Sequence, residues 1–244
     1  MVDHVGMSRK LWIPIGAVAV LALIGAGGAY AYFFSGLRTS PSSLALSSPS
    51  ASPSAASSAG GAGTWQITTG SLVGYRVTEQ FVGQSSTHEA VARTSDVSGQ
   101  VTITQTGTTY VMTSAKVTAQ LASLASVDQV AGYNVTNRDR IVSQSLGVGT
   151  YPTAVFQAQS VTLPAGVETG QTVTVSVPGQ LTIRGVTKDV TATVQLRVSG
   201  TTAQIAGSIS TNMTDFGISP PSIGFTTVQP ATTIEFSLNL AASA

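Results

Sequence analysis

Three residues in the first long β-like stretch have the types and spacing that ligand chemistry would need. Tyr75, Val77 and Glu79 alternate with polar residues, so an extended chain would place all three side chains on one face. A carboxylate at position 79 would then either reach the opening of an interior cavity or pair with a basic group. We therefore predict that this face belongs to a ligand site.

Two further groups of charges stand where the sequence predicts a helix start and a turn. Thr136 and Asp139 have the spacing of a capping box, which predicts that a short helix begins there. Arg138 and Asp139 would then cap this helix and pin it to its surroundings through an ion pair. Arg184 and Lys188 flank a predicted hairpin turn, where they are either solvated turn charges or a cationic rim for an anionic lipid head group.

The usual catalytic and metal-binding signatures are missing from the sequence. There is no cysteine, and the second of the two histidines, His88, stands in a polar stretch where histidine is usually an ordinary surface residue. No paired-histidine metal motif, G-x-S-x-G elbow or phosphate-binding glycine pattern occurs. With 9% charged residues, a net charge of +1 and no basic stripe, nucleic acid is not an expected partner. We therefore expect no catalytic residues, no metal and no cofactor.

The C-terminal three-quarters of the chain alternates apolar and polar residues with a period of two. This pattern is typical of half-buried strands, and about eight such stretches occur, whereas 83–96 reads as a loop or a weak edge strand. We predict an all-β fold, an antiparallel eight-stranded barrel with one short helix. Its inward side chains would join Tyr75, Val77 and Glu79 in the ligand site; they are Phe156, Val175, Val177, Leu181, Ile183, Val194, Leu196, Ile205, Ile209, Ile234 and Phe236.

Three groups of short motifs carry a resemblance to a known family. They are Asn137-Arg-Asp-Arg140 followed by Tyr151-Pro-Thr-Ala-Val-Phe156, Leu181-Thr-Ile-Arg-Gly-Val-Thr-Lys188, and Asp215-Phe-Gly-Ile218. Together they resemble the YceI-like family of bacterial lipid-binding proteins, also called polyisoprenoid-binding proteins. The resemblance implies a lipocalin-like barrel that encloses a long isoprenoid chain. The family usually has a histidine where this sequence has Glu79, so its head-group recognition is not carried over to this chain.

The N-terminal quarter has the composition of an anchor and a linker. The charge-free stretch Leu11–Phe34 is long enough to cross a membrane as a helix. Arg9 and Lys10 precede it, which places the N-terminus in the cytoplasm and the C-terminal domain outside. A signal peptide cleaved after Ala29-Tyr-Ala31 is the alternative. The predicted order is a cytoplasmic N-terminus, a transmembrane signal-anchor helix, a flexible Ser/Ala/Pro/Gly-rich linker and a YceI-like barrel domain, at 1–10, 11–34, 35–63 and 64–244.

The sequence thus predicts a membrane-anchored, extracytoplasmic lipid-binding protein. It would carry or sequester a polyisoprenoid or a similar amphiphile in the barrel interior. Two alternatives stay open: a solidly packed barrel that serves as a scaffold or adhesion module, and an enzyme built on the charges at positions 79, 138 and 139. A continuous interior cavity would distinguish a carrier from a scaffold. Space inside is favoured by small residues at inward positions, namely Ala154, Ala158, Ala192 and Gly207.

Overall fold

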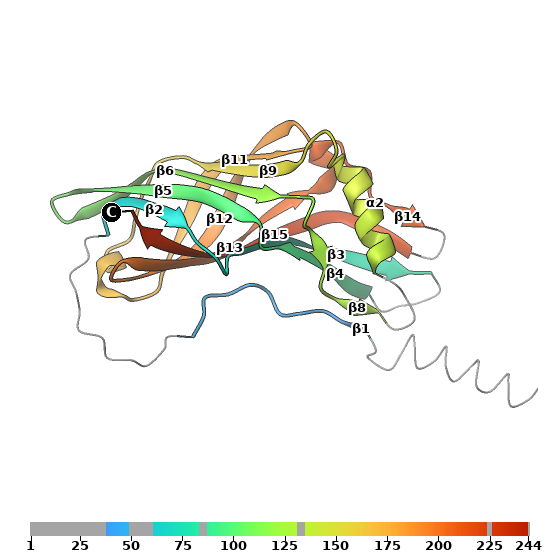
Figure 1. Ribbon diagram of the computed structural model, residues 1–244, viewed down its shortest axis with the longest axis horizontal. Helices are drawn as coiled ribbons and strands as arrows, with labels where there is room; N and C mark the ends of the chain where they lie inside the picture. Colours follow the sequence, from blue (N-terminus) through green and yellow to red (C-terminus); the bar gives the residue numbers. More distant parts are fainter. Residues whose placement is uncertain (1–37, 49–60, 83–86, 131–134, 224–225, 244) are drawn as a thin grey trace, which may run out of the picture. The chain divides into compact units, whose positions relative to one another are not determined.

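The computed structural model describes residues 38–48, 61–82, 87–130, 135–223 and 226–243 (Figure 1). These residues belong to two compact units. The smaller unit contains the short strands β1 (Arg38–Thr39) and β8 (Gln129–Val130), which pair in antiparallel fashion. The predicted membrane span at 11–34 lies outside the described residues. Within the described ranges, no helix is both long enough and apolar enough to cross a membrane.

The described residues of the larger unit form mostly strands, with one α-helix and two 3-10 helices. Its first strands are β2 (Gly63–Ile67), β3 (Leu72–Phe81), β4 (Thr87–Thr94), β5 (Val97–Thr106), β6 (Thr109–Gln120) and β7 (Ala125–Ser126). The helix α2 (Thr136–Leu146) follows, and then β9 (Thr153–Ala158), β10 (Val161–Thr162) and the 3-10 helix η2 (Val167–Thr169). The last elements are β11 (Val173–Ile183), β12 (Val186–Ser199), β13 (Thr202–Asn212), η3 (Met213–Phe216), β14 (Ser222–Ile223) and β15 (Thr226–Ala242).

The long strands close into a ring. Antiparallel neighbours follow the order β2-β5-β6-β9-β11-β12-β13-β15, and β15 pairs with both β13 and β2, which closes a barrel of eight strands. The strand β3 continues the line of β2 along the same edge of β15, and β4 pairs with β3 as β5 pairs with β2. Closure leaves no free edge in such a barrel. The predicted antiparallel eight-stranded barrel with one short helix is therefore confirmed.

Of the two interpretations that the sequence left open for 83–96, a loop or a weak edge strand, the structure has a strand near the end of the sheet, because Thr87–Thr94 form β4. This strand pairs with β3 over its whole length and with β7 at Ala92 and Arg93. Its inward residues include Ala90 and Ala92, whose exposed fractions are 0% and 1%. The local sequence is polar because several of its charged side chains have partners on other strands, and such partners are not visible in a sequence window.

Residues 40–48, which we call the N-terminal strap, lie along the barrel wall (Figure 1). Arginine side chains of the barrel donate hydrogen bonds to strap carbonyl groups: Arg93 Nη2 to Ser42 O at 2.6 Å and Arg197 Nη2 to Ser47 O at 2.6 Å. The sequence predicts a flexible linker throughout 35–63, and the strap differs from that prediction. It has few apolar side chains to bury, but its main-chain oxygens satisfy guanidinium groups of the barrel.

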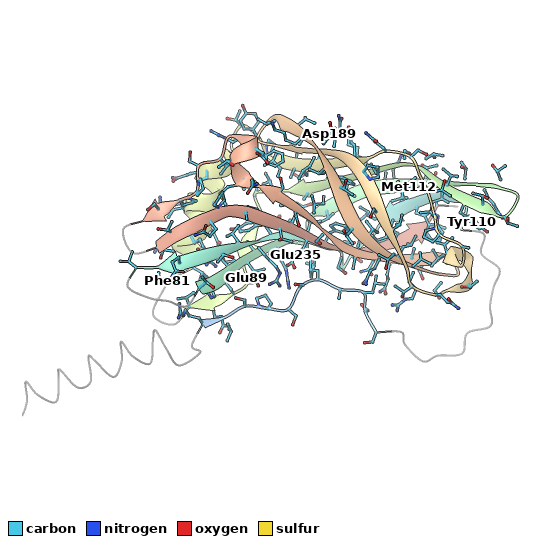
Figure 2. All side chains as sticks on the ribbon, turned by 180° about the vertical axis from the view of Figure 1, so that it is seen from behind. Phe81, Glu89, Tyr110, Met112, Asp189 and Glu235 are labelled. Atoms are coloured by element: carbon cyan, nitrogen blue, oxygen red, sulfur yellow. The ribbon has the colours of Figure 1, made fainter. Side chains whose placement is uncertain are left out.

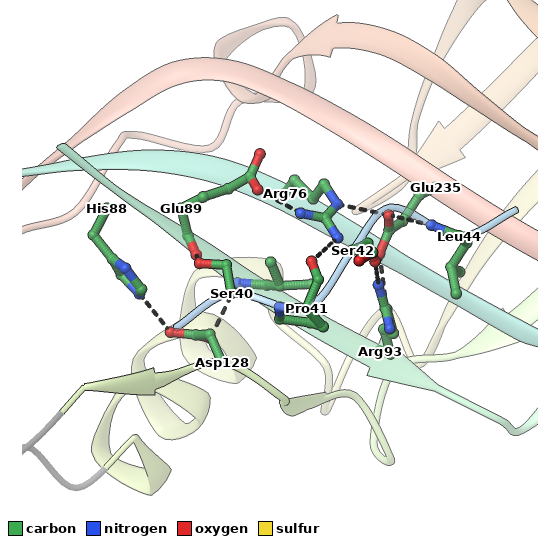
Figure 3. Close-up of polar contacts among 11 residues, drawn as sticks. Ser40, Pro41, Ser42, Leu44, Arg76, His88, Glu89, Arg93, Asp128 and Glu235 are labelled. Carbon is green, nitrogen blue, oxygen red and sulfur yellow. Dashed lines mark hydrogen bonds and ion pairs between the residues drawn. The ribbon is translucent and has the colours of Figure 1, made fainter. Parts of the chain in front are cut away.

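The strap covers a group of charges on the outward side of the sheet. Glu235 on β15 accepts hydrogen bonds from Arg76 Nε on β3 at 2.7 Å and from Arg93 Nε on β4 at 2.8 Å (Figure 3). The backbone N–H of Leu44 donates to the same carboxylate. Only 2% of Glu235 is exposed, although the residue alternates with the inward-facing Ile234 and Phe236. The strap therefore buries a charged group that would otherwise face water.

Candidate ligand cavity

The barrel encloses an apolar cavity of about 180 Å³. Its walls come from nearly every strand of the barrel and from Leu146 on α2. Twelve of the fourteen residues predicted for the ligand site line it; the two that do not are Val77 and Glu79. The walls also include residues that the sequence analysis did not assign to the site, among them Val101, Ile103 and Met112 on β5 and β6. Val101 and Ile103 follow the same period-two alternation as the predicted wall residues, and this pattern could have identified them from the sequence.

Several side chains that face the interior are only partly buried. Val175, Ile205, Ile234 and Phe236 line the cavity and keep intermediate exposure, whereas Val194 and Leu196 on β12 are buried. In a solidly packed core, inward aliphatic and aromatic side chains would be fully covered by neighbours at close-packed density. The interior of this barrel is therefore not filled by its own side chains.

The glycine at 207 has a different effect from the one predicted. Gly207 is paired with Phe236 across the sheet, and a Cβ atom at position 207 would come within 2.8 Å of Phe236 Cζ. Gly179 is paired with Ala158, but a Cβ atom at position 179 would likewise come within 2.6 Å of Phe156 Cζ. These glycines make room for aromatic rings to lie against the wall. The predicted space at Ala154, Ala158 and Ala192 is present, since all three line the cavity.

Three residues that carry polar groups line the cavity through their carbon atoms, since the wall itself is almost entirely apolar, and two of these groups are hydrogen-bonded within the protein. Trp65 Nε1 donates to the carbonyl oxygen of Gly61 at 3.2 Å. The Thr94 hydroxyl lies 2.7 Å from the Ser123 hydroxyl and accepts from the backbone N–H of Asp96 at 3.0 Å. The third is Tyr75, whose hydroxyl has no hydrogen-bond partner among the residues that the structure describes.

The two remaining predicted residues of β3 lie inside the barrel but beyond the cavity. Val77 packs with Ala90 and Val228 in a small separate cluster. Glu79 Oε2 lies 3.6 Å from Arg138 Nη1 on α2, and both side chains are buried. From the sequence, Glu79 could either reach the opening of the cavity or pair with a basic group. In the structure it pairs with Arg138. Burial raises the pKa of Glu79, and the charge of Arg138 opposes that rise only in part.

Arg138 is the centre of a buried polar cluster at the helix α2. Its Nη2 donates to Asp128 Oδ1, and its Nε donates to the hydroxyl of Ser126 at 3.1 Å. Asp128 also lies 2.8 Å from His88 Nε2 and accepts the backbone N–H of Val91 at 3.1 Å. Burial alone would raise the pKa of Asp128, but its hydrogen bonds with His88 and Arg138 hold that pKa below its ordinary value. All nitrogen atoms of the Arg138 guanidinium therefore face groups of the protein.

His88 is not the surface residue that the sequence suggests. It is 5% exposed and lies opposite Glu79 in the register of β3 and β4. The alternation of His88 with the small residues Ala90 and Ala92 was a signal that it faces inward. Its partner, Asp128, lies 40 residues further along the chain, and the sequence analysis did not single it out.

The predicted capping box does not form. The helix α2 begins at Thr136 with Val135 as its N-cap residue, and no side chain supplies the cap. The carboxylate of Asp139 accepts the backbone N–H of Ser126 at 3.0 Å and also the Ser126 hydroxyl. Asp139 therefore ties α2 to β7, and the predicted role of pinning the helix is carried out by hydrogen bonds to Ser126.

The predicted hairpin turn at Arg184 is present between β11 and β12. Arg184 has a positive φ of 53° and Gly185 one of 73°, the combination that a two-residue turn of type I′ requires. The Arg184 guanidinium donates to the carbonyl oxygen of Gly217, which follows η3. Arg184 therefore joins the hairpin to η3, and its Nη1 is already engaged by the protein.

The motif residues gather around this end of the barrel. Leu181 and Ile183 from one motif pack with Phe216 and Ile218 from another, and Leu146 of α2 contacts the same cluster. Each of these motifs therefore has a packing role that closes the barrel beside α2. Among the described residues, no group of three or more histidine, cysteine or acidic side chains is placed to hold a metal ion.

Comparisons with known proteins agree with this architecture. The fold is similar to a polyisoprenoid binding domain from Saccharophagus degradans implicated in plant cell wall breakdown, with a TM-score of 0.51, 14% identity and coverage of 73% of this chain and 98% of that one. BcnA from Burkholderia cenocepacia matches with a TM-score of 0.47, 20% identity and coverage of 68% and 95%. A search of curated proteins finds no match. The model of the YceI-like domain matches residues 65–240, which is more than half of the chain, and the protein therefore belongs to the YceI-like family.

Proposed function

We propose that this protein binds an apolar lipid inside its barrel and holds it outside the cytoplasmic membrane, without catalysing a reaction. The observation that carries the proposal is the apolar cavity, whose wall includes side chains that the protein itself leaves partly uncovered. A ligand chain would cover them, and each methylene group removed from water would contribute about 0.8 kcal/mol. The packed scaffold is less well supported, because a solid core leaves no such surface.

The cavity volume bounds the ligand that fits without rearrangement. An apolar cavity of about 150 Å³ accommodates benzene, so about 180 Å³ accommodates roughly seven carbon atoms. Pockets for drug-sized ligands measure about 300–1,000 Å³. We therefore propose that one end of a polyisoprenoid or similar chain occupies the cavity as it stands, and that a longer chain enters by displacing wall side chains.

A chain-length series tests this proposal. The full-length protein is purified from its own host, stripped of lipid, and offered straight-chain and branched alcohols of increasing length. Affinity should rise by a constant factor for each carbon added and then level off where the cavity ends. Native mass spectrometry of the unstripped protein should show a bound lipid. Absence of any bound lipid, together with no dependence of affinity on chain length, would support the packed scaffold.

The membrane anchor is the second part of the proposal. It rests on the charge-free stretch Leu11–Phe34 with Arg9 and Lys10 before it. Protease added to intact cells, or to spheroplasts where a wall shields the domain, should digest the barrel and spare the N-terminus. A released protein that begins near Tyr32 would mean cleavage and export instead of anchoring.

A further inference from the structure

The N-terminal strap is hydrogen-bonded to the barrel at both of its ends. At its start, Ser40 Oγ donates to the carbonyl oxygen of Glu89 on β4 at 2.5 Å (Figure 3). Near its other end, Ser47 accepts the hydrogen bond from Arg197 on β12. Glu89 lies toward one end of the barrel and Tyr110 at the other (Figure 2). The strap therefore joins the barrel at the end where β3 finishes and β4 begins, which we call the β3–β4 end.

The place of this first contact limits how far the barrel can lie from the predicted membrane span. The span ends at Phe34, so only the five residues 35–39 separate it from Ser40. A chain of that length extends over at most about 22 Å. A tether that was free from Phe34 to Gly63, the first residue of β2, could extend over about 100 Å. Attachment of the strap thus shortens the tether about fivefold.

The opposite end of the barrel is too far from Ser40 to be the end that meets the membrane. The strand β15 runs from the level of the first strap contact, where Thr232 pairs with Val77, to the level where Ala242 pairs with Trp65. About 33 Å of strand lies between these levels, and the β5–β6 hairpin extends further. A barrel standing on that end would hold Ser40 beyond the reach of about 22 Å, because the lipid head groups add to the distance.

The β3–β4 end also carries two exposed apolar side chains. Val82 directly follows β3 and is 68% exposed, and Val127, whose backbone N–H donates to Val91 O on β4 at 2.9 Å, is 43% exposed. The other strongly exposed large apolar residue of the described ranges is Tyr151, which lies against the turn at Gly185. A single exposed valine needs no explanation. Two of them beside the attachment point of a short membrane tether are placed to enter a bilayer interface.

We propose that the barrel rests on the membrane through its β3–β4 end, with Val82 and Val127 in the head-group region and the strap holding that end down. The partner of this surface is the lipid bilayer itself. The inference goes beyond lipid binding in the cavity, and it rests on the membrane anchor of the proposed function. Two valines alone bind a bilayer weakly, but a tether of five residues keeps them at a high effective concentration there.

Because the chain has no cysteine, single fluorescent labels can be placed on it directly. The full chain is reconstituted in phosphatidylcholine nanodiscs with an NBD label at Val82→Cys or Val127→Cys. The control is Thr108→Cys, in the exposed turn between β5 and β6 at the opposite end. Spin-labelled phosphatidylcholine should quench most of the emission at positions 82 and 127 and leave the emission at 108 unchanged.

The quenching pattern separates failure of the docking from failure of the anchor. If the protein stays on the nanodiscs but the two ends are quenched equally, or neither end is quenched, the docking proposal is overturned and the anchor stands. If the protein does not stay on the nanodiscs, the anchor is wrong and the docking proposal fails with it. Binding of lipid in the cavity is measured separately and depends on neither result.

Two insertions test whether the strap holds the barrel down. A flexible Gly/Ser linker of about 30 residues between Thr39 and Ser40 lengthens the short connection and keeps every strap contact, so quenching at 82 and 127 should be lost. The matched control is the same linker between Ser54 and Ala55, beyond the strap, which should leave the quenching as in wild type. Thermal melting of both variants checks that the barrel stays folded. Quenching that persists after the first insertion would overturn the role of the strap.

Discussion

The backbone N–H of Leu44 donates a hydrogen bond to Glu235 Oε2 at 3.1 Å, across 191 residues of sequence. This contact joins the N-terminal strap to a carboxylate that also accepts hydrogen bonds from Arg76 and Arg93 (Figure 3). Three donors thus converge on one buried charge. The relationship makes the strap part of the folded barrel, and it gives the first prediction.

Leu44→Pro removes the N–H donor and should destabilise the protein by about 1–3 kcal/mol, because the Glu235 carboxylate then lacks one of its partners in a buried setting. Thermal unfolding of the full chain measures the effect. Ala45→Pro is the matched control, since Ala45 is exposed and its N–H makes none of the hydrogen bonds between the strap and the barrel. Equal melting temperatures for Leu44→Pro and wild type would show that the hydrogen bond from Leu44 to Glu235 adds nothing to stability.

Glu235 should make the barrel sensitive to acid. Burial raises its pKa, but hydrogen bonds from Arg76 and Arg93 outweigh burial and hold the pKa below the ordinary value. A carboxylate of this kind stabilises the fold above its unfolded pKa of about 4.3 and loses that contribution as the pH falls through its folded pKa. Glu235→Gln should lower the free energy of unfolding at pH 7 by about 3 kcal/mol. Below about pH 4.3, the variant should lose less stability with falling pH than wild type does. Urea unfolding at a series of pH values measures both effects. Glu89→Gln, at a side chain that is 48% exposed, should change little.

Glu79 should have the opposite effect to Glu235 on how the stability depends on pH. Its folded pKa is raised, chiefly by burial, so the folded state binds a proton more readily than the unfolded state. Stability from this group is therefore lost as the pH rises from about 4.3 through the folded pKa. Glu79→Gln should raise the stability at pH 7 by about 1 kcal/mol, or a few degrees in melting temperature, with no gain at pH 4. A lower melting temperature at pH 7 would mean that the contact with Arg138 outweighs the cost of burying the charge.

Asp139→Ala should destabilise the protein by about 1–2 kcal/mol, because Ser126 loses the acceptor for its backbone N–H and its hydroxyl. Asn137→Ala, an exposed position on the same helix, is the control for any change in helix propensity. Chemical unfolding followed by circular dichroism reports both. If lipid retention falls while stability is unchanged, Asp139 has a role in binding that its contacts with Ser126 do not explain.

Val194→Trp tests whether the interior is a ligand site or a core. Val194 lines the cavity, so the indole can enter space that a ligand would use. We expect the lipid-free variant to keep most of its stability and to lose the co-purifying lipid. In a packed core the same change would cost about 1–3 kcal/mol or more. Gln195→Trp, exposed on the opposite face of the same strand, should retain the lipid, and both are compared by thermal melting and lipid extraction.

Much of the cavity wall could be predicted from the sequence. Side chains alternate between the two faces of a strand, so the pattern around Val194 and Leu196 is enough to assign which residues face inward. The same logic predicts the number of strands and the hairpin at Arg184, where Gly185 suits the second position of a two-residue turn. Strand number, side-chain direction and turn position each depend on residues close together in the sequence, so local patterns are enough to predict them.

The extent of the cavity was decided by tertiary structure. Tyr75 and Glu79 lie on the same face of β3, yet only Tyr75 borders the cavity, because α2 brings Arg138 against Glu79. The partners of His88 and Glu235 are far away in sequence, so the alternation of β4 and β15 could not reveal them. Side-chain direction follows from neighbours along one strand, whereas burial of a charge depends on which distant groups the closed barrel and its strap bring to it.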